Sequence, residues 1–230
     1  MMEEMLKYER NLFFFLNGSD FPALDRFMWL YSGKIVWLPA VAFLLFVIIY
    51  KKPWKEYLLV LLGIIAVAVL CDQFSAQICK PLFARLRPTH HPDFMNEVRT
   101  VFGYKGGRYG FISSHAANSF GFALYMSLLF RSRFFTITIM TWAVLTAYSR
   151  IYLGVHFISD VVAGALSGIL FGLLVYYAYT KVRRKYIAQA ENQTPAQLYS
   201  DRRKNYASIA VIASIITIAL FSTPLVALLT

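Results

Sequence analysis

Three short polar blocks interrupt an otherwise apolar chain, and together they hold two histidines, an aspartate and several cations. Their sequences are KPLFARLRP at 80–88, ISSH at 112–115 and SRIYLGVHFISD at 149–160. Such a set suits the binding and cleavage of a phosphate ester, because arginine and lysine bind phosphate oxygens while histidine can attack phosphorus or transfer a proton. This chemistry requires the chain to bring the three blocks together.

The first and third blocks supply cations and a histidine–aspartate pair. Lys80 and Arg87 can bind phosphate oxygens, although basic side chains at a helix end also extend to the membrane interface without binding a ligand. Arg150 adds a third cation, and Asp160 follows His156 by one helical turn, so that its carboxylate can orient the imidazole. An aspartate in an apolar span is costly unless it is paired, which favours a functional role over a purely structural pair.

The second block places polar side chains at the start of an apolar run. Ser113, Ser114 and His115 are expected in the first turn of a helix, where free backbone amides bind anions. A simpler interpretation is that Ser113 is only an N-cap and His115 an interfacial histidine. Taken with the other blocks, we interpret the two serines as part of the phosphate-binding set.

These residues suggest a mechanism that needs no metal and no other cofactor. Neutral His156 would attack phosphorus in line and form a phosphohistidine, while Asp160 holds the tautomer that leaves the attacking nitrogen free. His115 would protonate the leaving group and then accept a proton from the hydrolytic water. The cations that would offset charge on the equatorial oxygens are Lys80, Arg87 and Arg150.

The elements that must position the blocks are membrane spans. The chain has 230 residues, of which 58% are hydrophobic and 15% charged, unlike a soluble protein. Runs near the length of a bilayer crossing predict six spans, at 34–50, 56–79, 112–130, 134–153, 157–180 and 206–228. We expect an all-α integral membrane bundle of six helices over 34–230, with its core motifs at 80–160. Residues 1–33 are expected to form an interfacial amphipathic segment.

The placement of charge predicts the orientation of this bundle. A net charge of +11 would suggest nucleic acid for a soluble chain, but many of the basic residues lie in three connections between spans, at 51–55, 131–133 and 181–204. The positive-inside rule places these connections in the cytoplasm. Because membrane topology accounts for the basic residues, we do not expect a nucleic-acid partner. We therefore expect a protein of the bacterial inner (cytoplasmic) membrane whose active site faces the periplasm and takes a lipid phosphate from the bilayer.

Two further features surround the expected site. The segment between the second and third spans should cover the pocket, with Gly106 and Gly107 giving it freedom to move and with Lys105 and Arg108 available to a second phosphate. Asp72, inside the second span, is expected to face the bundle interior in a structural role.

The three blocks resemble the motifs of the type 2 phosphatidic acid phosphatases, membrane lipid phosphatases that share a core with vanadium haloperoxidases and glucose-6-phosphatase. The family pattern is K-x6-R-P, then P-S-G-H, then S-R-x5-H-x3-D. The first and third blocks match without departure, whereas Ile112 and Ser114 stand where the family usually has proline and glycine. The resemblance covers roughly 56–180 and implies the family's haloperoxidase-like helical fold and its phosphohistidine mechanism.

The expected function is hydrolysis of a phosphate monoester or diphosphate from a lipid. Undecaprenyl diphosphate, lipid A phosphate and phosphatidylglycerol phosphate are all chemically compatible with the residues. Two alternatives stay open from the sequence: a vanadate-dependent oxidase that uses the same oxyanion pocket, and a non-catalytic binder or transporter of lipid phosphates.

Overall fold

The computed structural model describes residues 2–19, 21–187 and 193–229, and over these residues the fold is all-α, as predicted. Besides helices, the described part contains one isolated bridge, between Leu86 and Tyr109. The α-helices are α1 (Met2–Leu16), α2 (Pro22–Ser32), α3 (Leu38–Ile49), α4 (Trp54–Gln73), α5 (Lys80–Phe83), α6 (Ser114–Phe130), α7 (Arg133–Tyr152), α8 (Ile158–Tyr186), α9 (Asp201–Leu220) and α10 (Ser222–Leu229). Shorter elements are η1 (Ile35–Trp37), the π-helical η2 (Phe74–Cys79), η3 (Pro88–His90) and η5 (Pro195–Leu198).

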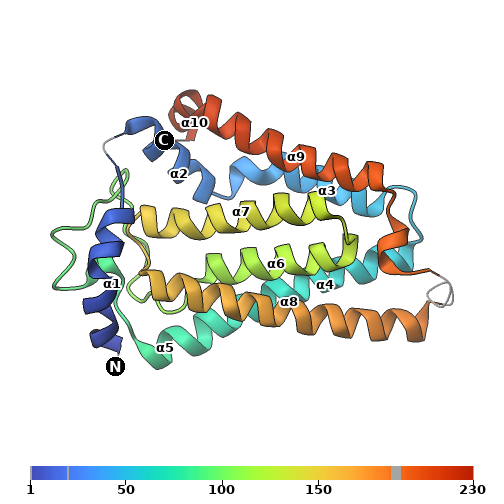
Figure 1. Cartoon of the computed structure of the whole chain (residues 1–230), viewed down its shortest axis with the longest axis horizontal. Coiled ribbons are helices and arrows are strands. Elements are labelled where there is room, and N and C mark those ends of the chain that lie inside the picture. Colours follow the sequence, from blue (N-terminus) through green and yellow to red (C-terminus); the bar gives the residue numbers. More distant parts are fainter. Residues whose placement is uncertain (1, 20, 188–192, 230) are drawn as a thin grey trace.

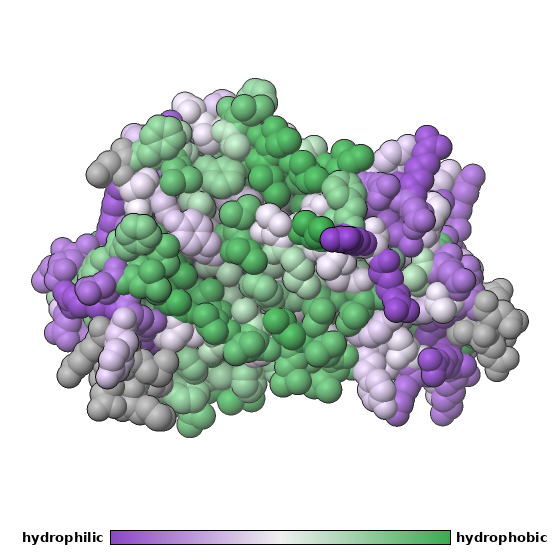
Figure 2. All heavy atoms as spheres, in the orientation of Figure 1, coloured by the Kyte–Doolittle hydropathy of each residue, from purple (hydrophilic) through white to green (hydrophobic). Residues whose placement is uncertain are grey.

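The molecule has the surface of an integral membrane protein. Figure 2 shows a broad hydrophobic band across the middle of the visible face, with hydrophilic residues gathered at both ends. Among the described residues, four helical stretches are long and apolar enough to cross a bilayer: Trp54–Phe83, α7, α8 and α9. A fifth candidate is the pair of α2 and Ile35–Ile49, which is bent by 74°.

The count of six straight spans was therefore not exact. The predicted first span at 34–50 is the 12-residue α3, preceded by η1 and the bend to α2. The predicted third span is the 17-residue α6. Hydrophobic runs locate apolar segments well, but they do not reveal where such a segment bends.

The connections of the bundle lie at two opposite ends. In Figure 1 the α3–α4, α6–α7 and α8–α9 connections lie at one end, while α1, the segment between α5 and α6 and the α7–α8 turn lie at the other. Helix α1 runs across that second end. There the centroid of the Phe13 ring lies 6.0 Å from that of the Phe94 ring and 5.4 Å from that of the Phe157 ring. Residues 188–192, within the predicted cationic connection at 181–204, are outside the described residues. The predicted cationic connections and the polar blocks thus occupy opposite ends.

Close packing of α6 on α8 brings the second and third blocks together. Glycines at every fourth position from 164 to 172 line one face of α8. A methyl group at Gly168 would lie 2.1 Å from the Ala117 carbonyl oxygen. The backbones of α6 and α8 are therefore so close at this point that only glycine fits between them. At the polar end, the Ser113 N–H donates to the Asp160 carbonyl oxygen at 3.0 Å.

A change of helix type positions the first block. Helix α4 continues through η2, where the Lys80 N–H donates to the Ser75 carbonyl oxygen five residues earlier. Pro81, which has no N–H, follows directly, and α5 ends where Ala84 takes a left-handed φ of 44°. Lys80 therefore projects from the helix, whereas Arg87 lies on the extended segment beyond it.

Candidate active site

The third block forms the predicted histidine–aspartate pair in the turn between α7 and α8. Gly154 makes this turn possible with a φ of +73°. His156 is buried, and its Nδ1 lies 3.4 Å from Oδ2 of Asp160, in the first turn of α8. The same Oδ2 accepts a hydrogen bond from the Phe157 N–H at 3.0 Å. Because the carboxylate faces Nδ1, Nε2 is the ring nitrogen available for attack.

Arg85 is a site residue that the sequence analysis did not assign. Its Nη1 donates to Oδ1 of Asp160 at 2.6 Å, and its Nη2 donates to Oε1 of Glu9 at 2.6 Å. The guanidinium is buried and lies 4.5 Å from the centroid of the Phe157 ring. Arg85 thus neutralises the aspartate and fixes its orientation. In the sequence, only the position of Arg85 inside the first block indicated that it could belong to the site.

Lys80 is held at the start of α6 by serine hydroxyls. Its Nζ donates to Oγ of Ser114 at 3.0 Å, and this oxygen also hydrogen-bonds Oγ of Ser75 at 2.6 Å. Ser114 has no positive φ, so serine replaces the family's glycine without backbone strain. Ser113 is the N-cap of α6: its buried Oγ accepts from the Ala116 N–H at 3.4 Å. The Ser113 side chain is thus engaged in the cap.

Arg87 and Arg150 are buried cations that form no ion pair with any described residue. Nε of Arg87 donates to the Tyr109 carbonyl oxygen at 3.1 Å. Arg150 donates to the hydroxyl groups of Ser32 and, at 3.2 Å, Tyr104. Burial lowers the pKa of Arg87, and the nearby Arg150 lowers it further. Two poorly solvated guanidinium groups so close together favour an anion between them.

His156 is neutral at pH 7 in this environment. Burial holds its pKa well below the ordinary histidine value, and the charges of Arg87, Arg150 and Lys80 lower it further. The three cations and His115 are therefore all within electrostatic range of this imidazole. The structure therefore brings together the predicted cations and both histidines.

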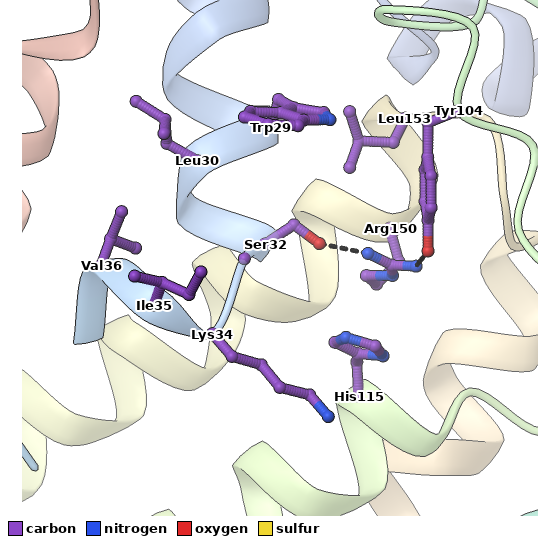
Figure 3. A pocket seen from close by; sticks show the side chains of 11 residues that line it. Trp29, Leu30, Ser32, Lys34, Ile35, Val36, Tyr104, His115, Arg150 and Leu153 are labelled. Atoms are coloured by element: carbon purple, nitrogen blue, oxygen red, sulfur yellow. Dashed lines mark hydrogen bonds between the residues drawn. The ribbon is translucent and has the colours of Figure 1, made fainter. Parts of the chain in front are cut away.

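His115 lies at a cavity of about 510 Å³ between α2, α6 and α7. Figure 3 shows the imidazole beside Arg150, with Tyr104 on one side and the Lys34 ammonium pointing toward it from the bend after α2. Ser32, one residue before this bend, reaches Arg150. The sequence analysis missed Lys34 and Tyr104, because each approaches the site from a segment without a recognisable motif.

The loop before α6 carries the glycines and cations that were expected around the pocket. Gly106 has a φ of +67°, and a methyl there would lie 2.4 Å from Nη1 of Arg87, so this glycine allows the loop to pack on the arginine. Lys105 and Arg108 are exposed and do not line the cavity beside His115. Their role with a second phosphate stays a prediction.

The expectation that Asp72 faces the bundle interior was wrong. Its side chain is exposed and lines a second cavity, of about 390 Å³, that also contacts His115 and Lys34. The bend between α2 and η1 opens this side of α4, and a hydrophobic run cannot show that a neighbouring helix bends away.

Comparison with known proteins gives consistent matches. The model of the PAP2 superfamily matches residues 56–184. The chain is 45% identical over 200 residues to a lipid A 4'-phosphatase of Porphyromonas gingivalis, covering 86% of this chain and 84% of the relative. It is 36% identical over 196 residues to a lipid A 4'-phosphatase of Bacteroides thetaiotaomicron, covering 85% of each. It is 28% identical over 172 residues to an undecaprenyl-diphosphatase of Sulfolobus acidocaldarius, covering 72% of this chain and 76% of the relative. No solved structure matches.

Proposed function

The chain belongs to the PAP2 superfamily and is a membrane lipid phosphatase, and from this premise we propose that it removes the 4'-phosphate of a lipid A-type glycolipid. The choice of substrate is supported by the two lipid A 4'-phosphatases, which align over 85% or more of this chain. The observation that carries the chemistry is the neutral, buried His156 within range of Lys80, Arg87 and Arg150. A fixed group of cations around an uncharged imidazole suits nucleophilic attack on a phosphate.

In the proposed first step, Nε2 of His156 attacks phosphorus and the bond to the sugar oxygen breaks. Asp160 faces Nδ1 and favours the tautomer with its proton there, and Arg85 holds the carboxylate in place. The three cations stabilise the charge on the equatorial oxygens. His115 lies at the cavity, where the bound phosphate dianion offsets the charges of Arg150 and Lys34 and allows the imidazole to carry the proton that it donates to the departing sugar oxygen.

In the second step, water hydrolyses the phosphohistidine. His115, now neutral, accepts a proton from the attacking water, and the N–P bond breaks to release inorganic phosphate. His156 returns to its neutral state, which the surrounding cations favour. The cycle uses two imidazoles in different roles.

The cavities support a substrate with hydrocarbon tails. The cavity that holds His115 and Asp72 shares Trp37, Phe122 and Trp142 with a third cavity of about 290 Å³. The third cavity is lined by apolar side chains of η1, α3, α4, α6, α7 and α9. A lipid can therefore place its phosphate at the histidines and its acyl chains against apolar walls within the hydrophobic band.

We place the protein in the bacterial inner membrane with the site on the periplasmic side. The support is the charge asymmetry between the two ends of the bundle, because lysine- and arginine-rich connections stay in the cytoplasm. In this orientation α1 lies at the periplasmic surface, where we propose that it is interfacial.

The test uses the full chain purified in detergent, with phosphate release measured from lipid A, undecaprenyl diphosphate and phosphatidylglycerol phosphate. We expect the wild type to act best on lipid A and to form a phosphoenzyme in rapid-quench experiments. His156→Ala should abolish both turnover and phosphoenzyme, and His115→Ala should lower turnover on the order of a hundredfold or more.

His90→Ala is a matched control, because this histidine lies in η3 and hydrogen-bonds its neighbour Thr89. Phosphate release by purified His156→Ala at the wild-type rate would reject the mechanism. A clear wild-type preference for undecaprenyl diphosphate would reject the choice of substrate and leave the mechanism intact.

A further inference from the structure

Two polar residues of the second cavity have no role in the proposed reaction. Asp72 projects from α4 and Asn118 from α6, and both line the cavity of about 390 Å³ that begins at His115 and Lys34. The proposed mechanism is complete without them. They nevertheless put a carboxylate and a carboxamide at a cavity between helices, next to the aromatic side chains of Trp37, Phe122 and Trp142.

Asp72 is costly at this position unless something compensates it. It lies in the long helical stretch Trp54–Phe83, and within the described residues it makes neither a hydrogen bond nor an ion pair. Its carboxylate is exposed to the cavity. An ionisable side chain that faces a cavity in a membrane span points to a ligand with hydrogen-bond donors.

Asn118 lies one turn after His115 on the same face of α6, about 4.5 Å farther along the helix axis. Its Oδ1 is buried and has no hydrogen-bond partner. Rotation of the amide by half a turn therefore breaks no hydrogen bond to Oδ1 and presents either its acceptor or its donor to the cavity. A group of this kind matches a hydroxyl, which both donates and accepts.

The order of side chains along the cavities tells which part of a substrate would meet this pair. Lys34 and His115 mark the phosphate end, whereas Trp37 and Phe122 mark the passage to the apolar cavity. Asp72 and Asn118 line the intermediate cavity, which shares residues with both of the others. The part of a lipid between its phosphate and its tails therefore meets them.

We propose that Asp72 and Asn118 form a specificity subsite that hydrogen-bonds hydroxyl or amide N–H groups on the sugar next to the scissile phosphate. This inference rests on the proposed function and deepens it. A glycolipid offers several such donors at this place, whereas a polyprenyl diphosphate offers its second phosphate, whose anionic oxygens donate no hydrogen bond, and then hydrocarbon. The subsite selects glycolipid phosphates because a bound lipid covers these polar groups, and a covered polar group without a partner strongly disfavours the wrong substrate.

The test compares kcat/KM for lipid A with kcat/KM for undecaprenyl diphosphate, using the full-length protein in detergent. Asp72→Leu and Asn118→Leu should each lower the ratio of the two values at least tenfold. Asp72→Asn, which keeps an acceptor of the same shape, should give an intermediate ratio. Asp93→Leu is the matched control, since Asp93 is exposed in the loop before α6, and it should keep the wild-type ratio.

The outcomes separate this inference from the proposed function. A ratio unchanged in both leucine variants, or a parallel loss on both substrates, overturns the subsite. A wild type that favours undecaprenyl diphosphate overturns the choice of substrate before any variant is measured. If Asp72→Leu does not fold, as judged by gel filtration, Asp72→Asn and Asn118→Leu still decide the question.

Discussion

Arginines near the site differ in what they contact, and this difference assigns their roles. Arg85 pairs with two carboxylates, those of Asp160 and Glu9. Arg87 and Arg150 pair with none among the described side chains, although both are buried. A guanidinium already neutralised by carboxylates is poorly placed to bind phosphate, so Arg85 is a positioning residue and the other two are phosphate ligands.

Replacement of Arg85 should therefore affect both catalysis and stability. In Arg85→Gln the buried carboxylate of Asp160 and the partly buried carboxylate of Glu9 lose their cation; for a buried pair this change typically costs about 3–5 kcal/mol. We expect kcat to fall at least tenfold, because Asp160 no longer holds His156 in one orientation, and the thermal unfolding midpoint to fall as well. Arg10→Gln breaks an exposed pair with Glu97 and is the control. An unchanged kcat in Arg85→Gln would contradict the positioning role.

The pH dependence of kcat/KM should report on His156 in the free enzyme. Its pKa is held below the ordinary value of 6.5, so the neutral nucleophile persists as the pH falls below 6.5. The acid limb should therefore lie below pH 6.5. Lys80→Met removes one of the charges that lower this pKa and should move the limb toward higher pH. A limb at or above 6.5 in the wild type would contradict a neutral His156.

At the residue scale the motifs identified side chains that the structure brings together, but they missed other residues that line the same cavity. Spacing alone indicated that His156 and Asp160 share a helical face; in the structure His156 precedes α8, but its Nδ1 still lies 3.4 Å from Oδ2 of Asp160. Lys34 and Tyr104 could not be found in this way, because Lys34 reaches the site through the bend after α2 and Tyr104 from the loop before α6, and neither belongs to a motif. The roles of the site residues in catalysis and phosphate binding stay predictions until the variants are measured.

At the scale of elements, the approach of α6 to α8 sets the distance between the two histidine-bearing blocks. The glycines of α8 allow backbone-to-backbone contact along the span. A second contact pins α8 at the opposite end, where Nε and Nη2 of Arg183 donate to the Glu56 carboxylate of α4 at 2.8 and 2.7 Å. The sequence analysis took Arg183 for one of the cytoplasmic charges, since a charge count cannot tell a buried cation from an exposed one.

A side chain at Gly168 should separate these helices. In Gly168→Ala the new methyl would meet the Ala117 carbonyl oxygen at 2.1 Å, so the backbones must move apart. Overpacking of this kind costs typically about 1–3 kcal/mol. We expect a lower thermal unfolding midpoint together with reduced turnover. Gly107→Ala adds its methyl where no atom lies within 4 Å and should change neither. Wild-type stability and turnover in Gly168→Ala would show that α6 and α8 do not need this contact.

At the scale of the whole molecule, hydropathy and charge predicted most of the architecture. The all-helical bundle and the gathering of basic connections at one end are both present. The break between α2 and α3 was not predicted, and it matters most for function. That bend supplies Ser32 and Lys34 to the cavity beside His115 and opens the passage toward the apolar cavity. Local hydrophobicity does not encode such a bend, because it depends on packing against α7 and α9.

The proposed orientation can be tested with single cysteines. Cys71 and Cys79 are both buried and unpaired, so a serine-substituted background is a suitable starting point. The two variants are Arg108→Cys and Lys51→Cys, and both positions are exposed. Residue 108 lies at the end of the bundle that carries the site, and residue 51 lies in the α3–α4 connection at the other end. In intact cells whose outer membrane has been made permeable, a membrane-impermeant maleimide should label position 108. Position 51 should react only after the inner membrane is disrupted, because the positive-inside rule keeps it in the cytoplasm. The reverse pattern would place the histidines on the cytoplasmic side and overturn the periplasmic assignment, while the geometry of the site would stand.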